Sequence, residues 1–326
     1  MLATGTATRL ATGLLAAGAL VLASCGGSDD DGNAGQPAPE ASSFPAADGR
    51  SLEQVLSEAD AEGPVVSPAG QVYRKGDNRY AFGVFTTGRE QISDAEVALY
   101  VAHGPTGEAK GPFPASVESL EVEPEFQSKT SADDPDSAHT VYVAEVPFDA
   151  DGEWRIGALI RDGDSLQASV VPSAVVGRFA DIPQPGDKAP SVHTPTAAEV
   201  GGDLSKIDTR VPPDTMHDDD LADVLGKEPV VLTFATPALC QSRVCGPTVD
   251  VAEQVKSKYG DKAAFIHMEI YNDNAIDKGL RPQVRAYNLP TEPWVFVIDE
   301  NGRIAESIEG AASPEALEQA VQEVTG

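Results

Sequence analysis

Hydrophobic and polar residues follow two different patterns along this chain. Between residues 60 and 180, short segments rich in β-branched and aromatic residues are separated by Gly, Asp, Pro and Asn. This pattern is typical of half-buried strands joined by turns. No segment with helical spacing lies between them, so we expect an antiparallel β-sandwich over residues 60–180. The predicted strands are Gly70–Arg74, Tyr80–Phe85, Ala95–Val101, Thr140–Val146, Trp154–Ile160 and Leu166–Val171.

In residues 227–326 the pattern changes, and strands alternate with helices. Continuous apolar runs are typical of strands that are buried on both faces. Pro247 stands near the start of a helical pattern, Asn301-Gly302 marks a hairpin turn followed by Arg303–Ile308, and Ser313 precedes a last amphipathic helix. We therefore expect an α/β fold here. The three apolar runs are Val230–Phe234, Ala263–Ile270 and Trp294–Ile298.

An export segment is expected at the N-terminus. Arg9 precedes an apolar stretch from Leu10 to Ala23, which is short for a transmembrane helix and typical of a signal peptide. Its end, Leu22-Ala23-Ser24-Cys25, resembles the lipobox of bacterial lipoproteins; a cleaved signal with an incidental Cys is the alternative. The resemblance implies that residues 1–25 are a signal peptide, that Cys25 is lipidated, and that the protein is lipid-anchored at the extracytoplasmic face of the cell membrane.

Two further segments look like connections. Residues 26–59 begin with a run of Gly, Pro, Ala, Ser and Asp that has almost nothing to bury, and we expect a disordered tether. Residues 181–226 are rich in Pro and Asp, and we expect an extended connector. His217 adjoins three Asp residues, but consecutive side chains do not converge on one point, so we expect no metal site there.

Charge and composition restrict the possible partners. The chain carries 52 Asp plus Glu against 23 Lys plus Arg, a formal charge of −29. This charge repels phosphates and argues against nucleic acid as a partner. Three Cys are too few for a four-Cys zinc site or a disulfide-dense scaffold. We expect neither a metal nor another cofactor.

Each of the two folded regions resembles a known family. The stretch YVAEVPFDADGEWRIGALI resembles bacterial immunoglobulin-like modules, in which a Gly-containing turn precedes a strand with a buried Trp, here Trp154. No catalytic residues gather in this region, so we expect a spacer or docking module. Residues 227–326 resemble the thioredoxin fold, because VVLTFATPALC is a buried strand that runs into a Cys at the start of a helix. The implied fold class is multidomain, an all-β immunoglobulin-like sandwich followed by an α/β thioredoxin-like fold.

A second motif strengthens the thioredoxin resemblance. TEPWVFVIDENGRI is similar to a segment of membrane-anchored thiol–disulfide oxidoreductases, in which a proline precedes a strand and an acidic turn. The resemblance implies that Pro293 is the cis-proline that faces the active site; Pro290 is the alternative. It also implies that the neighbouring Glu292 and Trp294 contact a substrate, because a cis-proline leaves backbone groups free for an incoming peptide.

Cys240 and Cys245 are the two remaining cysteines, and disulfides persist outside the cytoplasm. A helix N-terminus favours a thiolate, and Arg243 between the two Cys is expected to stabilise it and contact the substrate. Four residues separate the Cys, where the family motif has two. Five helical steps rise about 7.5 Å, whereas bridged Cα atoms lie roughly 4.4–6.8 Å apart, so both Cys cannot pair within one regular helix.

We therefore expect the helix to begin at about residues 246–247, with Cys245 at its cap and Cys240 in the preceding loop. Cys240 is then the exposed nucleophile and Cys245 the resolving thiol, although the helix terminus could favour Cys245 as the nucleophile. The catalytic residues implied are Cys240, Cys245 and Pro293.

Three functions are compatible with these residues. The first is a membrane-anchored extracytoplasmic thiol–disulfide oxidoreductase that acts on protein thiols and disulfides. The second is a non-catalytic binding or scaffold lipoprotein with a structural disulfide. The third is a Sco-like copper-handling protein, but that family has a His near the cis-proline and this segment has none; His267 is expected to pack in its strand. The direction of electron flow stays open.

Overall fold

The computed structural model describes residues 1–2, 35–240 and 242–326. The predicted signal peptide beyond its first two residues, and with it Cys25, lies outside these residues. Residues 35–326 belong to one compact unit. Within the described part of the chain, no helix is long and apolar enough to cross a membrane.

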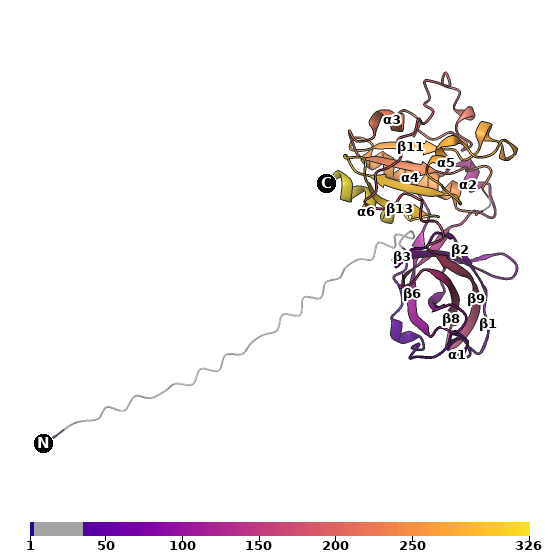
Figure 1. The fold of residues 1–326 in the computed structure, drawn as a ribbon, viewed down its shortest axis with the longest axis vertical. Coiled ribbons are helices and arrows are strands. Elements are labelled where there is room, and N and C mark those ends of the chain that lie inside the picture. The colour runs from indigo at the N-terminus through magenta and orange to yellow at the C-terminus, as the bar shows by residue number, and fades with distance from the viewer. Residues whose placement is uncertain (3–34, 241) are drawn as a thin grey trace. The chain divides into compact units, whose positions relative to one another are not determined.

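The first sheet has nine strands, coloured indigo to dark red in Figure 1. Their order is β1-β9-β8-β5-β6-β7-β3-β2, and β4 also pairs with β3. Each pairing is antiparallel except that of β1 with β9. The strands are β1 (Ala61–Glu62), β2 (Val65–Pro68), β3 (Gly76–Phe85), β4 (Gln91–Ile92), β5 (Glu96–His103), β6 (Ala109–Ser119), β7 (Thr140–Phe148), β8 (Gly152–Asp162) and β9 (Ser165–Val176).

Five of the six strands predicted between residues 60 and 180 are confirmed. The sixth, Gly70–Arg74, is not a strand, and only Tyr73 forms an isolated bridge, with Val176. The sequence pattern missed β6, since its Pro112 and Pro114 break the alternation that marks a strand.

One hydrophobic core joins strands from both halves of this sheet, including β3, β5, β7, β8 and β9. Trp154 on β8 is fully buried in this core, as expected, and its Nε1 donates a hydrogen bond to the carbonyl of Ala150 at 2.9 Å. Its ring packs against Phe148 of β7. Strand alternation turns these aromatic side chains to the same interior.

Residues 41–56, which we expected to lie in a disordered tether, fold against the sheet. They form the 3-10 helix η1 (Ala41–Ser43) and the helix α1 (Leu52–Leu56), which Ser51 and Gln54 cap reciprocally. Phe44, Leu52 and Val55 are buried beside residues of β5 and β8. The tether prediction was wrong here because it gave weight to the Gly and Pro content and overlooked three spaced apolar side chains.

The second sheet has four strands in the order β11-β10-β12-β13, drawn in orange to yellow in Figure 1. β10 pairs with β11 in parallel, and the other two pairings are antiparallel. The strands are β10 (Val230–Phe234), β11 (Ala264–Met268), β12 (Trp294–Ile298) and β13 (Ile304–Glu309). Among the helices that accompany them are α4 (Cys245–Tyr259), η3 (Asn272–Asn274), η4 (Ile276–Lys278), α5 (Pro282–Ala286) and α6 (Pro314–Thr325).

Both faces of this sheet are covered, which explains the continuous apolar runs in its strands. Val231 of β10 packs with residues of α4 and α6 on one face. Its neighbours Val230 and Leu232 pack on the other face with α5 and with the connector. As predicted for residues 227–326, strands alternate with helices, and the last helix follows the hairpin of β12 and β13.

The connector, residues 181–226, was expected to be extended, but it also contains short helices and buried side chains. It contains η2 (Leu204–Lys206) and α3 (Leu221–Val224) and carries several buried polar side chains. Arg210 pairs with Asp250 of α4, with 2.8 Å between Nε and Oδ1 and both side chains almost fully buried. Asp250 Oδ2 also accepts hydrogen bonds from the backbone N–H and the hydroxyl of Ser128, which caps α2 (Lys129–Ala132). One carboxylate therefore joins α4, the connector and the loop before β7.

A half-buried carboxylate, Glu309 at the end of β13, links the nine-stranded sheet region to the four-stranded sheet. It accepts hydrogen bonds from the backbone N–H groups of Gln71 and Val72 and from the hydroxyl of Thr291. Burial raises the pKa of Glu309, and these hydrogen bonds oppose that rise.

Candidate redox site

The Cys240–Cys245 pair is the centre of the candidate site. The two sulfurs are bonded, and the Cα atoms lie 5.9 Å apart, within the range for a disulfide. Cys245 is the first residue of α4 and fully buried, whereas Cys240 is half-buried in the preceding loop. Placing Cys240 outside the helix is what allows the pair to form across four intervening residues. The helix begins at Cys245, slightly before the predicted residues 246–247.

One hydrogen bond and one unusual backbone conformation define the path of the loop that carries Cys240. Near its start, the backbone N–H of Ala238 donates to the hydroxyl of Thr209 in the connector, at 3.1 Å. Near its end, Arg243 has a φ of 68°, in the left-handed region that non-glycine residues rarely adopt. This reversal returns the chain to Cys245 and α4, so that the two sulfurs meet.

Ser242 was not predicted as a site residue, but it contacts both sulfurs. Its Oγ lies 3.2 Å from Sγ of Cys240 and 3.8 Å from Sγ of Cys245. The same hydroxyl is 3.4 Å from the carbonyl oxygen of Glu292. Ser242 therefore connects the disulfide to the segment that precedes β12. A hydroxyl-bearing residue between two cysteines was the available signal in the sequence.

The Glu292–Pro293 peptide bond is cis, as the sequence resemblance implied. Within the described residues, Pro290 has no cis bond, so Pro293 takes the predicted position. The carbonyl of Glu292, which belongs to this cis peptide, is the group that Ser242 approaches. The cis peptide and the disulfide are thus neighbours, joined by one hydroxyl.

Glu292 is a titratable group beside this peptide. Burial and the charge of nearby Glu269 raise the pKa of Glu292 to about 7, and a hydrogen bond with Tyr271 partly opposes the rise. Its Oε2 is buried and has no hydrogen-bond partner among the described residues. A carboxyl group with a pKa near neutrality is able to hold or release a proton at physiological pH.

Trp294 and Arg243 have contacts that differ from those expected. Trp294 is 1% exposed, stacks on Phe296 and donates from Nε1 to Thr291, because strand alternation turns its side chain into the core. Its side chain therefore supports β12 from inside instead of facing a substrate. The guanidinium of Arg243 pairs with Asp136 at 2.9 Å and lies 5.1 Å from the centroid of the Phe85 ring.

A cavity of about 320 Å³ lies beside the Cys loop. The loop contributes Ser242, Arg243 and Val244 to its lining, and the nine-stranded sheet region contributes apolar side chains such as Phe82, Phe85 and Val141. Ser242 lines this cavity and also contacts both sulfurs, so it is the residue that connects the cavity to the disulfide.

No protein-family model matches this chain, and no curated protein matches it. Among solved structures, the chain is similar to a putative thiol:disulfide interchange protein DsbE from Chlorobium tepidum, at 20% identity over 44% of this chain and 99% of that one, with a TM-score of 0.32.

It is also similar to a thioredoxin family thiol:disulfide interchange protein from Chlorobium tepidum TLS, at 17% identity over 43% and 100% of the two chains, with a TM-score of 0.28. The Lin-41 filamin domain matches at 11% identity over 36% and 99%, with a TM-score of 0.20. All three TM-scores are below 0.5, so these likenesses carry no weight beside the geometry of the site.

Proposed function

We propose that this protein is a thiol–disulfide oxidoreductase that exchanges disulfides with protein partners through Cys240 and Cys245. The observation that carries the proposal is the position of the pair: one half-buried cysteine in a loop, one buried cysteine at a helix N-terminus, and a cis-proline peptide beside them. This arrangement gives a partner thiolate access to Cys240 while Cys245 is shielded.

The exchange proceeds in two steps. A partner thiolate attacks Sγ of Cys240, a mixed disulfide forms, the Cys240–Cys245 bond breaks, and its electron pair leaves on Sγ of Cys245, which takes up a proton. A second partner thiolate then attacks the partner sulfur, and Cys240 leaves as a thiolate that is protonated in turn. The partner loses two electrons and two protons, and the protein gains them. The reverse sequence reduces a partner disulfide, and both directions pass through the same mixed disulfide on Cys240.

Three groups of this chain favour the leaving thiolate of Cys245. The unpaired N–H groups at the start of α4 stabilise negative charge on its sulfur. The hydroxyl of Ser242 is positioned to donate a hydrogen bond to either sulfur. Glu292, with its pKa near neutrality, is a proton reservoir one residue before the cis-proline.

The substrate class that fits the site is an extended polypeptide bearing a cysteine. The backbone around Pro293 is suited to pair with such a peptide, and the adjacent cavity has room for an apolar side chain of the same partner. The strong negative charge of the chain disfavours nucleic acid as a partner.

The location and organisation of the protein are part of the same proposal. Lipidation of Cys25 would anchor the protein at the extracytoplasmic face of the cell membrane, where disulfide exchange has substrates. We propose that residues 60–180 form an immunoglobulin-like sandwich that helps to present the redox site, and that residues 227–326 form a thioredoxin-like domain. The order of the second sheet and the cis bond at Pro293 support the latter.

Trapping the mixed disulfide tests the proposal. Full-length protein with Cys25→Ser, so that only the loop sulfurs react, is incubated in reduced form with an oxidised peptide disulfide, and adducts are measured by mass spectrometry. Cys245→Ser in this background should retain the peptide on Cys240. Cys240→Ser should retain at least about tenfold less, because its remaining sulfur is buried.

Two outcomes would contradict the proposal. Adduct formation on Cys240→Ser alone would reverse the roles of nucleophile and resolving thiol. No adduct on either variant, together with a wild-type bridge that stays closed in strong reductant, would favour a structural disulfide in a binding or scaffold protein.

A further inference from the structure

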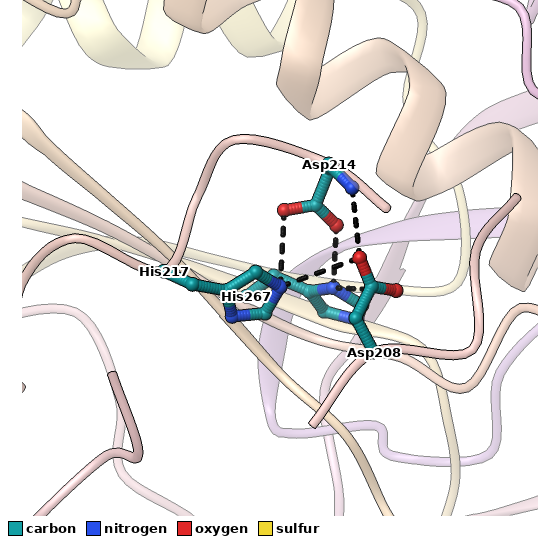
Figure 2. Close-up of side chains that lie close together, drawn as sticks. All are labelled: Asp208, Asp214, His217 and His267. Atoms are coloured by element: carbon teal, nitrogen blue, oxygen red, sulfur yellow. Dashed lines mark hydrogen bonds and ion pairs between the residues drawn. The ribbon is translucent and has the colours of Figure 1, made fainter. Parts of the chain in front are cut away.

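Two aspartates and two histidines converge in a buried cluster that the proposed redox chemistry does not use (Figure 2). Asp208, Asp214 and His217 come from the connector, and His267 comes from β11. One ligand atom from each residue lies within 4.8 Å of the others. Each of the four residues is at most 3% exposed.

The spacing of these atoms fits a tetrahedral metal ion. Bonds of about 2.0–2.1 Å from zinc to nitrogen and oxygen place neighbouring ligand atoms about 3.3 Å apart. In the cluster, His217 Nε2 lies 3.3 Å from an oxygen of Asp214 and 3.4 Å from one of Asp208. His267 Nδ1 lies 2.7 Å from Asp214 and 3.8 Å from Asp208. The two histidines approach different oxygens of each carboxylate, and one atom from each residue lies within 4.8 Å of the other three, so small side-chain shifts would bring a single set to the tetrahedral spacing.

Surrounding hydrogen bonds orient three of the four side chains. Nε2 of His267 is 3.1 Å from the carbonyl of Ala235, which can only accept, so this nitrogen carries a hydrogen. Nδ1 is in hydrogen-bond contact with Asp214 Oδ2 at 2.7 Å, and a metal ion would take the place of the hydrogen between them. Backbone N–H groups of Arg210 and Asp214 donate to Asp208, and that of Met216 donates to Asp214. Such outer contacts are typical of metal ligands, because they fix each side chain, and each carboxylate oxygen keeps a second lone pair for coordination.

His217 supplies independent evidence that a ligand is needed. Its side chain is 2% exposed and points into the cluster, yet neither ring nitrogen has a hydrogen bond among the described residues. Its Nε2 is too far from both aspartates for a normal hydrogen bond. Buried polar atoms without partners are rare, and coordination of Nε2 to a cation would satisfy this one.

Charge balance leads to the same conclusion. Two buried carboxylates require two positive charges nearby, since unpaired charges are costly to bury. A divalent cation held by two carboxylates and two neutral imidazoles balances the cluster. Without a metal, an imidazolium at His267, hydrogen-bonded to Asp214, would balance one carboxylate. Balancing the second would require an imidazolium at His217, which would bury two N–H donors that have no hydrogen bond.

We propose that Asp208, Asp214, His217 and His267 bind one divalent transition-metal ion, and that zinc is the ion that fits best. Imidazole with carboxylate suits zinc, whereas calcium and magnesium prefer oxygen ligands alone and copper(I) prefers thiolates or thioethers. Four protein ligands leave no open position, so the site is structural and not catalytic.

The ion would tie the connector to the base of the redox loop. Three of the ligands lie within residues 208–217 of the connector. The fourth, His267, is hydrogen-bonded to the carbonyl of Ala235, the residue directly after β10. Thr209 directly follows the ligand Asp208, and its hydroxyl accepts a hydrogen bond from the backbone N–H of Ala238 in the Cys loop. Metal binding should therefore stabilise the fold and fix the segment that leads to Cys240.

Elemental analysis of the wild-type protein tests this directly. The full-length chain, in its disulfide form so that the loop sulfurs are not ligands, is unfolded with chelator and refolded with zinc, cobalt(II) or no metal. We expect about one zinc per chain, a melting temperature at least about 5 °C higher than without metal, and the intense visible absorption of tetrahedral cobalt(II).

Variants assign the ion to the cluster. His217→Gln and His267→Gln should lose stoichiometric zinc and the visible cobalt(II) absorption. His193→Gln is the matched control, since His193 also lies 2.7 Å from an aspartate, Asp220, but outside the cluster and partly exposed. This control should retain about one zinc per chain.

The wild-type measurement decides the proposal even if the cluster variants fail to fold. Absence of stoichiometric metal after refolding with each ion, with an unchanged melting temperature, would overturn the proposal. The four side chains would then form a hydrogen-bonded network without a metal ion. Retention of zinc by both cluster variants would place the ion elsewhere and would equally overturn it.

Discussion

Two polar regions flank α4, and they differ in how far water reaches them. At the start of the helix, the Cys loop and the neighbouring segment before β12 carry half-buried groups, Cys240 in the loop and Glu292 in the segment. Further along, Asp250 and Arg210 form an enclosed ion pair whose hydrogen bonds reach three separate segments. The loop is open enough to react, whereas the enclosed pair holds the chain together. The comparison predicts that the effect of a substitution on stability increases with burial.

The largest effect on stability is expected at the enclosed pair. Asp250→Ala leaves the Arg210 guanidinium buried without its partner and also removes the acceptor of Ser128, so the free energy of unfolding should fall by about 3–5 kcal/mol. Urea unfolding followed by circular dichroism measures this. The control is Glu318→Ala, which breaks the more exposed pair of Lys258 and Glu318 and should cost about 1 kcal/mol or less. Equal losses in the two variants would contradict the comparison.

Glu292 should give an intermediate effect that depends on pH. Because its pKa is raised from 4.5 to about 7, the folded state binds more protons than the unfolded state between these pH values. Its contribution to the free energy of unfolding therefore falls as the pH rises from 4.5 to 7. Glu292→Gln removes this dependence, and the variant should be more stable than wild type by about 1–2 kcal/mol above pH 7, after allowance for partial exposure.

The measurement is a series of unfolding curves between pH 4 and 8 for wild type and variant. The two should be nearly equal in stability at the acid end and diverge as the pH rises. Glu300→Gln, an exposed glutamate in the hairpin turn, is the control. A constant difference between Glu292→Gln and wild type at every pH would show that burial does not perturb this carboxyl group.

Ser242→Ala should separate reactivity from stability. The hydroxyl contacts both sulfurs at an exposed position, so its loss should slow disulfide exchange with a peptide by about threefold to tenfold, roughly the contribution of one hydrogen bond. The free energy of unfolding should change by less than about 0.5 kcal/mol. Stopped-flow thiol exchange and urea unfolding provide the two numbers. A variant that loses stability but keeps its exchange rate would assign Ser242 a structural role.

The smallest effect is expected for Asp136→Asn, which breaks the ion pair with Arg243. Asp136 is half exposed, so solvent screens the pair, and the free energy of unfolding should fall by about 0.2–1 kcal/mol. Thermal unfolding at low and high salt measures it, and added salt should reduce the difference from wild type. A larger loss would mean that Asp136 also holds the Arg243 guanidinium in place over the Phe85 ring.

The sequence predicts features that depend on neighbouring residues. The apolar runs at β10 and β12 marked two buried strands with the bounds observed, and the resemblance of the segment around Pro293 to thiol–disulfide oxidoreductases implied the cis bond. Local pattern also led to errors. Pro112 and Pro114 concealed β6, and the Gly-rich and Pro-rich context of Phe44 concealed a packed segment.

Features that depend on distant residues were beyond the sequence. His217 and His267 are 50 positions apart and meet only because the connector folds over β11. The adjacent Asp218, Asp219 and Asp220 drew attention to the wrong carboxylates, since the partners are Asp208 and Asp214. For Trp294, the motif identified the strand correctly but could not indicate which face its side chain occupies.

The connector covers one face of the second sheet with Ile182, Leu221 and Val224, in addition to its polar contacts. A fragment that begins at residue 227 would expose this apolar face. It would also leave the imidazole of His267 and the carboxylate of Asp250 buried without their partners in the connector. Anyone who wishes to isolate the part of the chain that carries Cys240 and Cys245 should therefore keep residues 181–226 attached to it.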